Sequence, residues 1–178
     1  MSKRKIIILG GTGFVGRHLT ARLCALGHEV TVITRRRDRH RDLLVLPTVR
    51  LVEGDVHNPA LLIDEFQGHD TAINLVGILN EAGHDGRGFE RAHAELPAKV
   101  VAACRASGVT RLLHMCALKA ADDAPSQYLR SKARGEALVL AAKDLQVTSF
   151  RPSVIFGPDD SFTRRFAKLL KLTPLVFP

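Results

Sequence analysis

The chain has few residues of the kinds that build disulfide, metal or membrane structures. Its three cysteines, Cys24, Cys104 and Cys116, are scattered over 178 residues, and its eight histidines form no metal-binding pair. Such cysteine usage is typical of a reducing compartment. The longest apolar runs are too short to span a bilayer, and no signal-peptide pattern is visible. We therefore expect a cytoplasmic globular protein without a metal site.

Aromatic residues are also scarce. The sequence has no tryptophan and one tyrosine, Tyr128, while an excess of basic residues gives a net charge of +8. Part of this excess lies in a basic run at residues 35–41. Such a run can bind nucleic acid, but the low aromatic content and the lack of a DNA- or RNA-binding module lead us to expect no nucleic-acid partner. A solvated loop and a phosphate site on a cofactor are the other two explanations of the run.

Short apolar runs alternate with helical stretches along the whole chain. Strands are predicted near residues 4–9, 29–34, 49–53, 70–76, 110–116 and 146–151. Helices are predicted near residues 14–26, 58–66, 89–107 and 126–143, with a weaker one near 39–46. The strands are β-branched and apolar on both faces, as buried parallel strands are. The alternation predicts one α/β domain over residues 1–178, a Rossmann-type doubly wound parallel sheet flanked by helices.

The last residues form an apolar segment. A helix-like stretch at residues 162–172 is followed by Leu175-Val176-Phe177-Pro178 without a polar tail. We expect residues 157–178 to begin a C-terminal region that is truncated in this chain. An uncovered apolar segment favours association, so a homodimer is one expected state.

The most informative segment joins a strand, a glycine turn and a helix at residues 5–23. In the turn, Gly10 allows the tight bend, Gly13 lets a pyrophosphate approach the backbone, and Gly16 lets the helix pack on the strand. The N-terminus of the helix offers N–H groups and a positive dipole end to phosphates. A plain tight turn is the simpler explanation of these glycines. Their position directly after a buried strand predicts a dinucleotide site instead.

A second feature is the pair formed by Tyr128 and Lys132 on the helix that follows the fifth strand. Residues four apart share a helix face. A lysine ammonium beside the hydroxyl would lower the pKa of Tyr128 and make it a general acid or base near neutral pH. The alternative is an exposed helix face without chemistry, because such pairs also occur by chance.

Five motifs together resemble the short-chain dehydrogenase/reductase superfamily over nearly the whole chain. They are the glycine turn at 10–16, Gly-Asp-Val at 54–56, Asn-Leu-Val-Gly at 74–77, Tyr-x-x-x-Lys at 128–132 and Arg-Pro-x-x-x-x-Gly-Pro at 151–158. The glycine spacing and the last motif resemble the extended or atypical branch, known as NAD-dependent epimerase/dehydratase. Within this branch, residues 74–79 and 89–93 resemble relatives of the 39-kDa-type accessory subunit of respiratory complex I.

The resemblance implies roles for the matching positions. Tyr128 would be the acid/base, while Lys132 would bind the nicotinamide ribose and tune Tyr128. Asp55 would accept a hydrogen bond from the adenine amino group. The other implied cofactor contacts are the turn residues Gly10, Thr12, Gly13, Phe14, Val15 and Gly16 at the pyrophosphate, Val56 beside the adenine, Leu75, Val76 and Gly77 along the adenosine ribose, and Pro152, Ser153 and Val154 around the nicotinamide amide.

Two positions depart from the family pattern. Cys116 stands at the end of the fifth strand, where the family usually has serine or threonine. A thiol is a weak hydrogen-bond donor and would polarise a substrate carbonyl poorly. His93 stands where many relatives have asparagine, and a histidine without a role is the simpler explanation there. Both changes bear on turnover and leave cofactor binding untouched.

The residues after the second strand predict which cofactor is bound. Dehydrogenases that use NAD commonly place a carboxylate there for the ribose 2′-OH, whereas an arginine accommodates a 2′-phosphate. Here Arg35 and Arg36 follow residues 29–34, about 20 residues past the glycine turn. A guanidinium can pair with phosphate in a forked geometry. We predict NADP(H), with Arg35 the first candidate and Arg36 the second, and NAD(H) is the alternative.

Two functions from different classes fit these observations. The first is an NAD(P)-dependent oxidoreductase that transfers hydride between nicotinamide and a carbonyl or alcohol carbon of an unidentified small molecule. Epimerisation or dehydration would begin with the same step. The second is a catalytically weak NADP(H)-binding sensor or assembly factor, which the resemblance links to a respiratory complex or to peripheral membrane association. The Tyr128/Lys132 pair favours the enzyme, and Cys116 favours the second function. A nucleic-acid-binding regulator of this fold ranks third.

Overall fold

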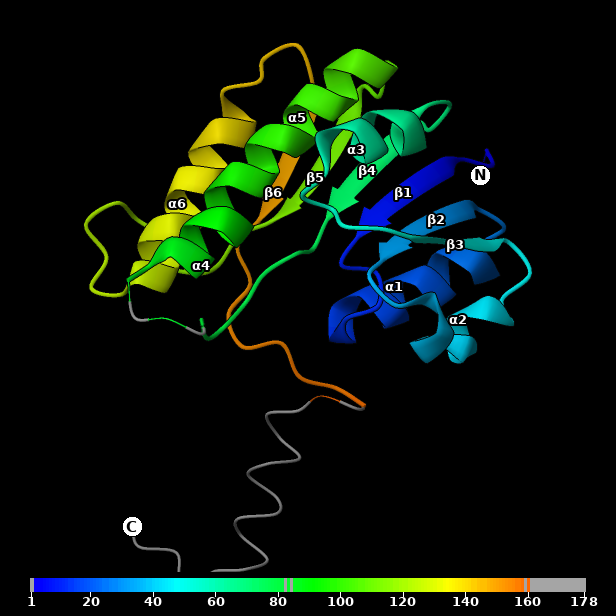
Figure 1. The fold of residues 1–178 in the computed structure, drawn as a ribbon, viewed down its shortest axis with the longest axis horizontal. Coiled ribbons are helices and arrows are strands. Elements are labelled where there is room, and N and C mark those ends of the chain that lie inside the picture. The colour runs from blue at the N-terminus through cyan, green and yellow to red at the C-terminus, as the bar shows by residue number, and fades with distance from the viewer. Residues whose placement is uncertain (1, 82, 84, 159, 161–178) are drawn as a thin grey trace, which may run out of the picture.

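Six parallel strands form one sheet in the order β3-β2-β1-β4-β5-β6 (Figure 1). The computed structural model describes residues 2–81, 83, 85–158 and 160. The strands are β1 (Lys5–Leu9), β2 (Glu29–Thr34), β3 (Val49–Glu53), β4 (Thr71–Asn74), β5 (Arg111–Met115) and β6 (Gln146–Phe150). The strand order reverses between β1 and β4, which confirms the predicted doubly wound, Rossmann-type sheet.

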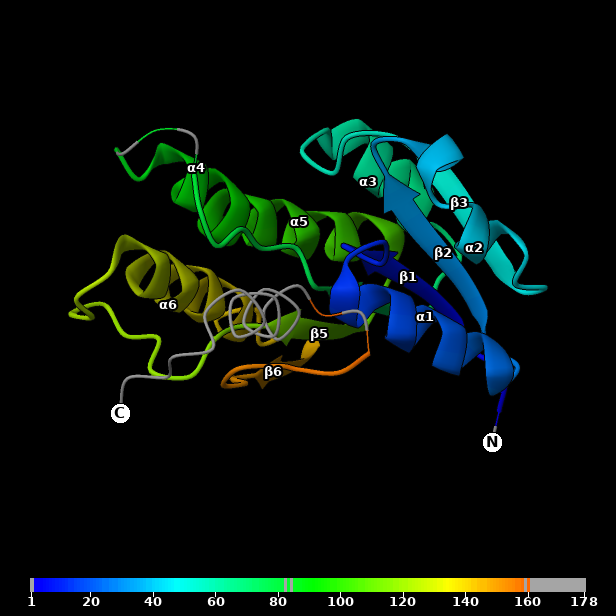
Figure 2. The same cartoon turned by 90° about the horizontal axis from the view of Figure 1, so that it is seen from below.

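Helices cover both faces of this sheet, as Figure 2 shows. One face carries α1 (Phe14–Ala25) and the short α2 (Arg41–Leu44). The other face carries α3 (Pro59–Phe66), α5 (Leu96–Ser107) and α6 (Gln127–Leu140), with α5 packed between the other two. The connections therefore cross from one face to the other between β3 and β4.

The four residues that follow Lys5 in strand β1 are all apolar and buried. Ile7 and Leu9 lie in the core cluster that includes the buried residues of α3 and α5. Ile6 and Ile8 lie in the cluster on the α1 face. Successive side chains of a strand point to opposite faces, so a central strand covered on both sides must be apolar at every position. Each such side chain stabilises the fold by roughly 1.5–3 kcal/mol.

The helix predicted at 89–107 is longer than expected and is interrupted. It begins as α4 (Arg87–Glu90), passes through a π-helical turn, η2 (Arg91–Glu95), and continues as α5. Pro97 has no N–H to donate to the carbonyl of His93, four residues earlier, and the wider π turn accommodates this missing bond.

Other boundaries differ by a few residues. β4 ends at Asn74 rather than at 76. The Leu75 N–H still donates to the Leu9 carbonyl of β1, but the Val76 N–H turns to the side chain of Asn74. The helix predicted near 39–46 is a 3₁₀ turn, η1 (Arg37–Arg39), followed by α2. The helix predicted at 126–143 ends at Leu140. The stretch expected to be helical at 162–172 and the apolar segment after it lie outside the described residues.

An apolar groove of about 440 Å³ runs along α1 on the face of β4, β5 and β6. Leu19 and Leu23 line it from α1, and Ile73, Leu113 and Phe150 line it from the strands. In the described part of the chain, no helix is both long and apolar enough to cross a bilayer.

Candidate functional site

A cleft of about 800 Å³ lies at the carboxyl ends of β1, β2, β3 and β4, where the strand order reverses. This is the position at which doubly wound sheets bind ligands. Its walls are formed by the loops that follow these strands and by the start of the α4–η2 segment. The lining residues are Gly10, Thr12, Gly13, Ile33, Thr34, Arg35, Arg36, Arg39, Gly54, Asp55, Val56, His57, Leu75, Val76, Gly77, Ile78, Gly88, Arg91 and Ala92.

The glycine turn has the geometry that its sequence predicts. Gly10 has a φ of +78°, which L side chains rarely adopt. A Cβ on Gly16 would lie 2.2 Å from the carbonyl oxygen of Gly10, so helix α1 approaches the strand closely. No side chain caps α1 at Gly13, and the N–H groups of its first turn stay available to a ligand.

Three turn residues with an implied cofactor contact, Phe14, Val15 and Gly16, lie outside the lining of this cleft. The ring of Phe14 packs edge-on against His18, with centroids 5.4 Å apart. Val15 lines the apolar groove along α1. Of the glycine turn, only Gly10, Thr12 and Gly13 therefore line the cleft.

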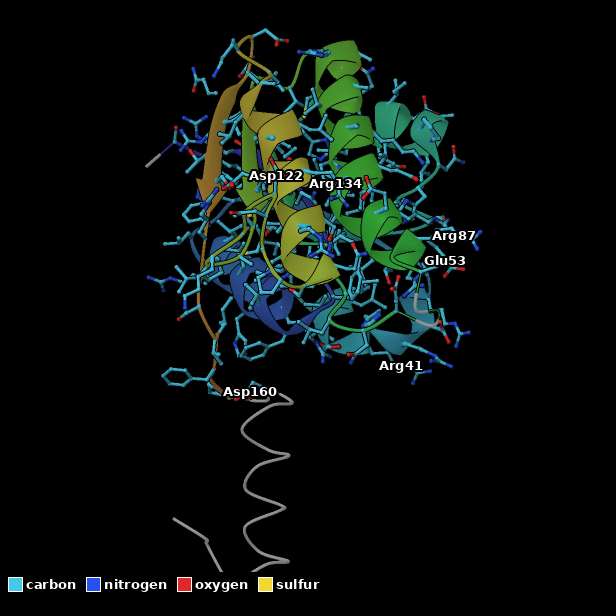
Figure 3. All side chains as sticks on the ribbon, turned by 90° about the vertical axis from the view of Figure 1, so that its left-hand side faces the viewer. Arg41, Glu53, Arg87, Asp122, Arg134 and Asp160 are labelled. Atoms are coloured by element: carbon cyan, nitrogen blue, oxygen red, sulfur yellow. The ribbon has the colours of Figure 1, made fainter. Side chains whose placement is uncertain are left out.

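Arginine side chains form one wall of the cleft. Arg35 and Arg36, the two candidates for a 2′-phosphate contact, line it, and Arg39 joins them from the 3₁₀ turn. All three are exposed. The backbone N–H of Arg37 donates to Glu53 at 3.0 Å, which anchors this run to β3. Figure 3 shows Glu53 among the charged side chains of the molecule.

Asp55 and Arg91 face each other across the cleft. Asp55 Oδ1 accepts from the backbone N–H of His57 at 2.9 Å, while Oδ2 lies 3.7 Å from the Arg91 guanidinium. Val56, whose implied position is beside the adenine, also lines the cleft. Arg39 and Arg91 are site residues that sequence reasoning missed, because neither stands at the end of a strand.

Residues 75–78 form the edge of the cleft after β4, and we call them the cofactor loop after the role that the resemblance implies. Leu75, Val76 and Gly77, whose implied contacts are along the adenosine ribose, line the cleft, and Ile78 does so as well. A Cβ on Gly77 would lie 3.0 Å from Nζ of Lys132. The lysine therefore approaches this loop from α6, and a larger residue at position 77 would press on it.

Lys132 is buried, with 4% of its surface exposed. Its Nζ donates to the carbonyl oxygen of Met115 at 3.1 Å. Burial lowers the pKa of Lys132 to about 8. The ammonium is therefore held beneath the end of β5 and beside the cofactor loop, and it is charged at neutral pH.

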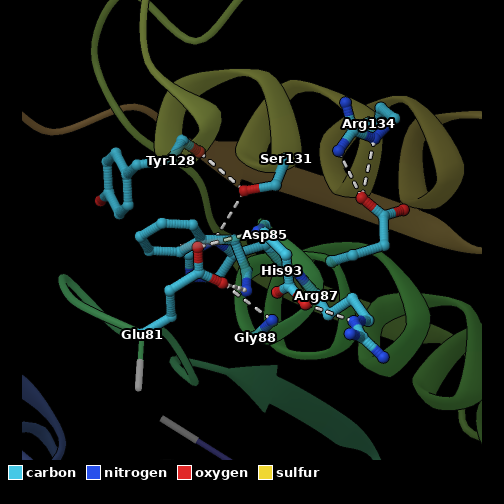
Figure 4. A network of polar contacts seen from close by, with 11 residues as sticks. Glu81, Asp85, Arg87, Gly88, His93, Tyr128, Ser131 and Arg134 are labelled. Atoms are coloured by element: carbon cyan, nitrogen blue, oxygen red, sulfur yellow. Dashed lines mark hydrogen bonds and ion pairs between the residues drawn. The ribbon is translucent and has the colours of Figure 1, made fainter. Parts of the chain in front are cut away.

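The expected effect of Lys132 on Tyr128 is wrong. Burial of the hydroxyl, followed by the nearby Cys116 thiol, raises the pKa of Tyr128. The Tyr128 ring packs edge-on against Phe89 and His93, with centroids 6.1 and 5.3 Å apart (Figure 4). These contacts shield the ring partly from water, which disfavours the charged phenolate, and Lys132 is not among the causes of the shift.

Cys116 lies directly after β5 and is buried. Its Sγ is 3.6 Å from the carbonyl oxygen of Lys132, and burial raises the pKa of the thiol. The thiol is therefore protonated and directed at the backbone of α6. Among the residues that the structure describes, no group of three or more histidines, cysteines or acids could hold a metal ion.

The segment after β6 runs beside the segment after β5. The Cys116 N–H donates to the carbonyl of Phe150, and the Leu118 N–H donates to the carbonyl of Pro152, both at 2.8 Å. Ser153 and Val154 follow, and both are exposed. The side chains with implied roles at the nicotinamide end, Tyr128, Lys132, Cys116 and residues 152–154, lie outside the lining of the cleft.

The fold, the glycine turn and the cleft define a dinucleotide-binding α/β domain. The model of the NAD dependent epimerase/dehydratase family matches residues 6–172. The chain belongs to this family.

Two curated relatives are similar over almost the whole chain. The chain is 32% identical over 174 residues to the ceramide reductase of Caulobacter vibrioides, covering 96% of this chain and 52% of that protein. It is also 32% identical over 173 residues to the mitochondrial NADH dehydrogenase (ubiquinone) 1 alpha subcomplex subunit 9 of Dictyostelium discoideum, covering 95% of this chain and 47% of that protein. The chain thus spans about half the length of the curated relatives it matches.

Solved structures show the same fold. The Bordetella bronchiseptica enzyme WbmH, in complex with NAD+, matches with a TM-score of 0.80 and 21% identity, covering 94% of this chain and 64% of that one.

Proposed function

We propose that this chain binds NADP(H) in the cleft and supports hydride transfer between the nicotinamide and a carbonyl or alcohol carbon of a small molecule. The observation that carries this proposal is the wall of Arg35, Arg36 and Arg39 in the cleft that begins at the glycine turn. The uncapped start of α1 suits the pyrophosphate, and the arginines suit a 2′-phosphate. The residues present therefore fit a nicotinamide dinucleotide.

The preference for NADP(H) should be measurable. A hydrogen bond to a charged group contributes roughly 1.5–3 kcal/mol, so a single arginine–phosphate contact would give about 10- to 150-fold preference, and a second contact would add to it. Arg35 and Arg36 are exposed, and salt therefore weakens the attraction. We expect the lower part of this range at physiological ionic strength.

The chain's own residues would handle the proton. The nicotinamide supplies or accepts the hydride when the cofactor is bound. In the reduction direction, the Tyr128 O–H bond breaks and an O–H bond forms on the substrate oxygen as hydride reaches the carbonyl carbon. A raised pKa keeps Tyr128 protonated at neutral pH, which suits this donor role. Lys132, whose Nζ lies at the Met115 carbonyl and beside Gly77, would bind the nicotinamide ribose.

Titration calorimetry with NADPH and NADH tests the assignment of the cofactor. The variants are Arg35→Ala/Arg36→Ala and, as a charge-matched control, Arg37→Ala/Arg41→Ala, which removes two charges of the same run outside the cleft lining. We expect the wild type and the control to prefer NADPH at least about tenfold and the first variant to lose this preference. Equal affinities in the wild type, or a preference that survives in Arg35→Ala/Arg36→Ala, would contradict the assignment.

A second candidate function is a cofactor-binding subunit or assembly factor without turnover. The buried Cys116 thiol, held against the α6 backbone where a hydroxyl is expected, favours it. The similarity to the NADH dehydrogenase subunit supports a respiratory-complex partner. A panel of carbonyl substrates with NADPH separates the two functions. Tight NADPH binding without turnover of any substrate would select the second.

A further inference from the structure

Two buried histidines lie beneath the cofactor loop. His93 comes from the π-helical turn η2 and is 1% exposed, and His114 comes from β5 and is 2% exposed. Hydrogen bonds connect each of them to the backbone on which the adenosine half of the proposed cofactor would rest. The direction of these bonds fixes the position of the ring proton in each histidine.

His114 holds the first half of the loop through Asn74. The Val76 N–H donates to Asn74 Oδ1 at 3.1 Å, so the amide nitrogen of Asn74 faces His114 Nδ1, 3.3 Å away. An amide nitrogen only donates, which makes Nδ1 the acceptor and places the proton of neutral His114 on Nε2. This Nε2 has no hydrogen-bond partner among the described residues.

His93 holds the second half of the loop directly. The Ile78 N–H donates to His93 Nε2 at 3.0 Å, so the ring proton of neutral His93 is on Nδ1. That N–H donates to Ser131 Oγ at 2.9 Å, and the Ser131 hydroxyl donates to the carbonyl of Tyr128 at 2.8 Å (Figure 4). One imidazole thus joins the cofactor loop to α6, between Tyr128 and Lys132.

Backbone packing holds His93 in place. A Cβ on Gly135 of α6 would lie 1.7 Å from the carbonyl oxygen of His93, so the π turn and α6 touch backbone to backbone. This is the carbonyl to which residue 97, being proline, has no N–H to donate. Ser131 lies one helical turn before Gly135 and therefore faces the same turn. A π turn of this kind is frequent at functional sites.

Burial, helped by nearby positive charge, keeps both rings neutral. Burial, then the Lys132 charge and His114, lower the pKa of His93 to about 3. Burial and Lys132 lower the pKa of His114 to about 4, while Glu136 on α6 acts in the opposite direction. A protonated His93 could not accept from Ile78.

We propose that His93 is a positioning residue that ties the cofactor loop to helix α6, so that cofactor binding and the placement of Tyr128 and Lys132 are coupled. The inference rests on the proposed function, which assigns the loop to the cofactor. It predicts opposite ring tautomers for His93 and His114. It also predicts that NADPH binding slows amide exchange in α6, because His93 connects the loop to that helix.

Three substitutions separate the two hydrogen bonds of His93, one with the Ile78 N–H and one with the Ser131 hydroxyl. In His93→Gln, the longer amide can offer its oxygen to the Ile78 N–H. In His93→Asn, the shorter amide can form a hydrogen bond with the Ser131 hydroxyl but cannot reach the Ile78 N–H. His93→Phe keeps a ring and removes both hydrogen bonds. The matched control is Arg134→Ala, which breaks the ion pair of α6 with Glu90 of α4 but does not touch the loop.

Nitrogen-15 NMR and amide hydrogen exchange provide the readouts. In the unliganded wild type, we expect the proton on Nδ1 in His93 and on Nε2 in His114, with slow exchange at Ile78. NADPH should slow exchange at Tyr128 and Lys132 in the wild type and in Arg134→Ala, but not in His93→Phe. We expect His93→Phe and His93→Asn to bind NADPH about 3- to 10-fold more weakly, and His93→Gln to retain most of the affinity.

Specific results would overturn the inference. These are a His93 proton on Nε2, fast exchange at Ile78 in the wild type, or His93→Phe with wild-type affinity and a wild-type response of α6 to NADPH. If Arg134→Ala also loses the NADPH-induced slowing of exchange at Tyr128 and Lys132, the coupling depends on general helix packing rather than on His93, and the inference fails. If the wild type binds neither NADPH nor NADH, the proposed function and the coupling both fail, whereas the tautomers and Ile78 exchange still show whether the tie exists.

Discussion

Acidification from pH 7 to pH 5 should destabilise this protein chiefly through its buried histidines. In the folded chain the pKa of His93 is about 3 and that of His114 is about 4. An exposed histidine in the unfolded chain has a pKa of about 6.5. Between these values the unfolded chain binds more protons than the folded chain, so stability is lost as the pH falls below about 6.5.

The size of the effect follows from the same pKa values. Each histidine should lower the free energy of unfolding by about 2 kcal/mol between pH 7 and pH 5, and the pair by about 4 kcal/mol. Burial also lowers the pKa of His57 and of His69, and both add to the loss. The surface carboxyl of Asp144, with a pKa of about 2 beside Arg105, loses its contribution only at lower pH.

Urea unfolding at pH 7 and pH 5 measures this loss, and two variants assign it. Domains are typically stable by about 5–15 kcal/mol, so the expected loss for the wild type is a large fraction of the total. His93→Gln and His114→Gln should each reduce the loss by about 2 kcal/mol, whatever their stability at pH 7. The reasoning would be refuted if the wild type were equally stable at both pH values. It would also be refuted if the variants lost as much free energy of unfolding between pH 7 and pH 5 as the wild type does.

Three further predictions concern chemistry and association. Tyr128→Phe should remove most of kcat in steady-state assays and leave NADPH affinity nearly unchanged, and a large loss of affinity would contradict its role at the substrate. Cys116→Ser should preserve or raise kcat, because a hydroxyl is the better donor, and complete loss of turnover would show that this position is misread. The apolar groove along α1 should cause self-association in light scattering, and a monomer at high concentration would count against it.

Features that depend on local chain geometry could be predicted from the sequence. The uninterrupted apolar run of β1 requires a strand covered on both faces, and the glycines at 10 and 16 require a tight turn and close packing. The arginines after β2 reach the cleft because parallel strands end at one edge of the sheet. Each of these inferences needs only the order of the elements.

Features that depend on contacts between distant segments could not be predicted. The expectation that Lys132 lowers the pKa of Tyr128 used helix periodicity alone, whereas burial against Phe89 and His93 decides the direction. The role of Ser131 and the direction of its bonds follow from the π turn that packs against Gly135. Pro97 is the only sequence signal for that turn, and by itself it also fits the first turn of a new helix.

The central claim is that a nicotinamide dinucleotide lies against the glycine turn. Titration calorimetry of NADPH into the wild type and into Gly13→Val tests it most directly, with circular dichroism to show that the variant is folded. Gly13 is exposed at the start of α1, and a branched side chain there would occupy the path of the pyrophosphate. We predict saturable binding to the wild type and none to Gly13→Val. A folded Gly13→Val that binds NADPH with unchanged affinity would contradict the claim.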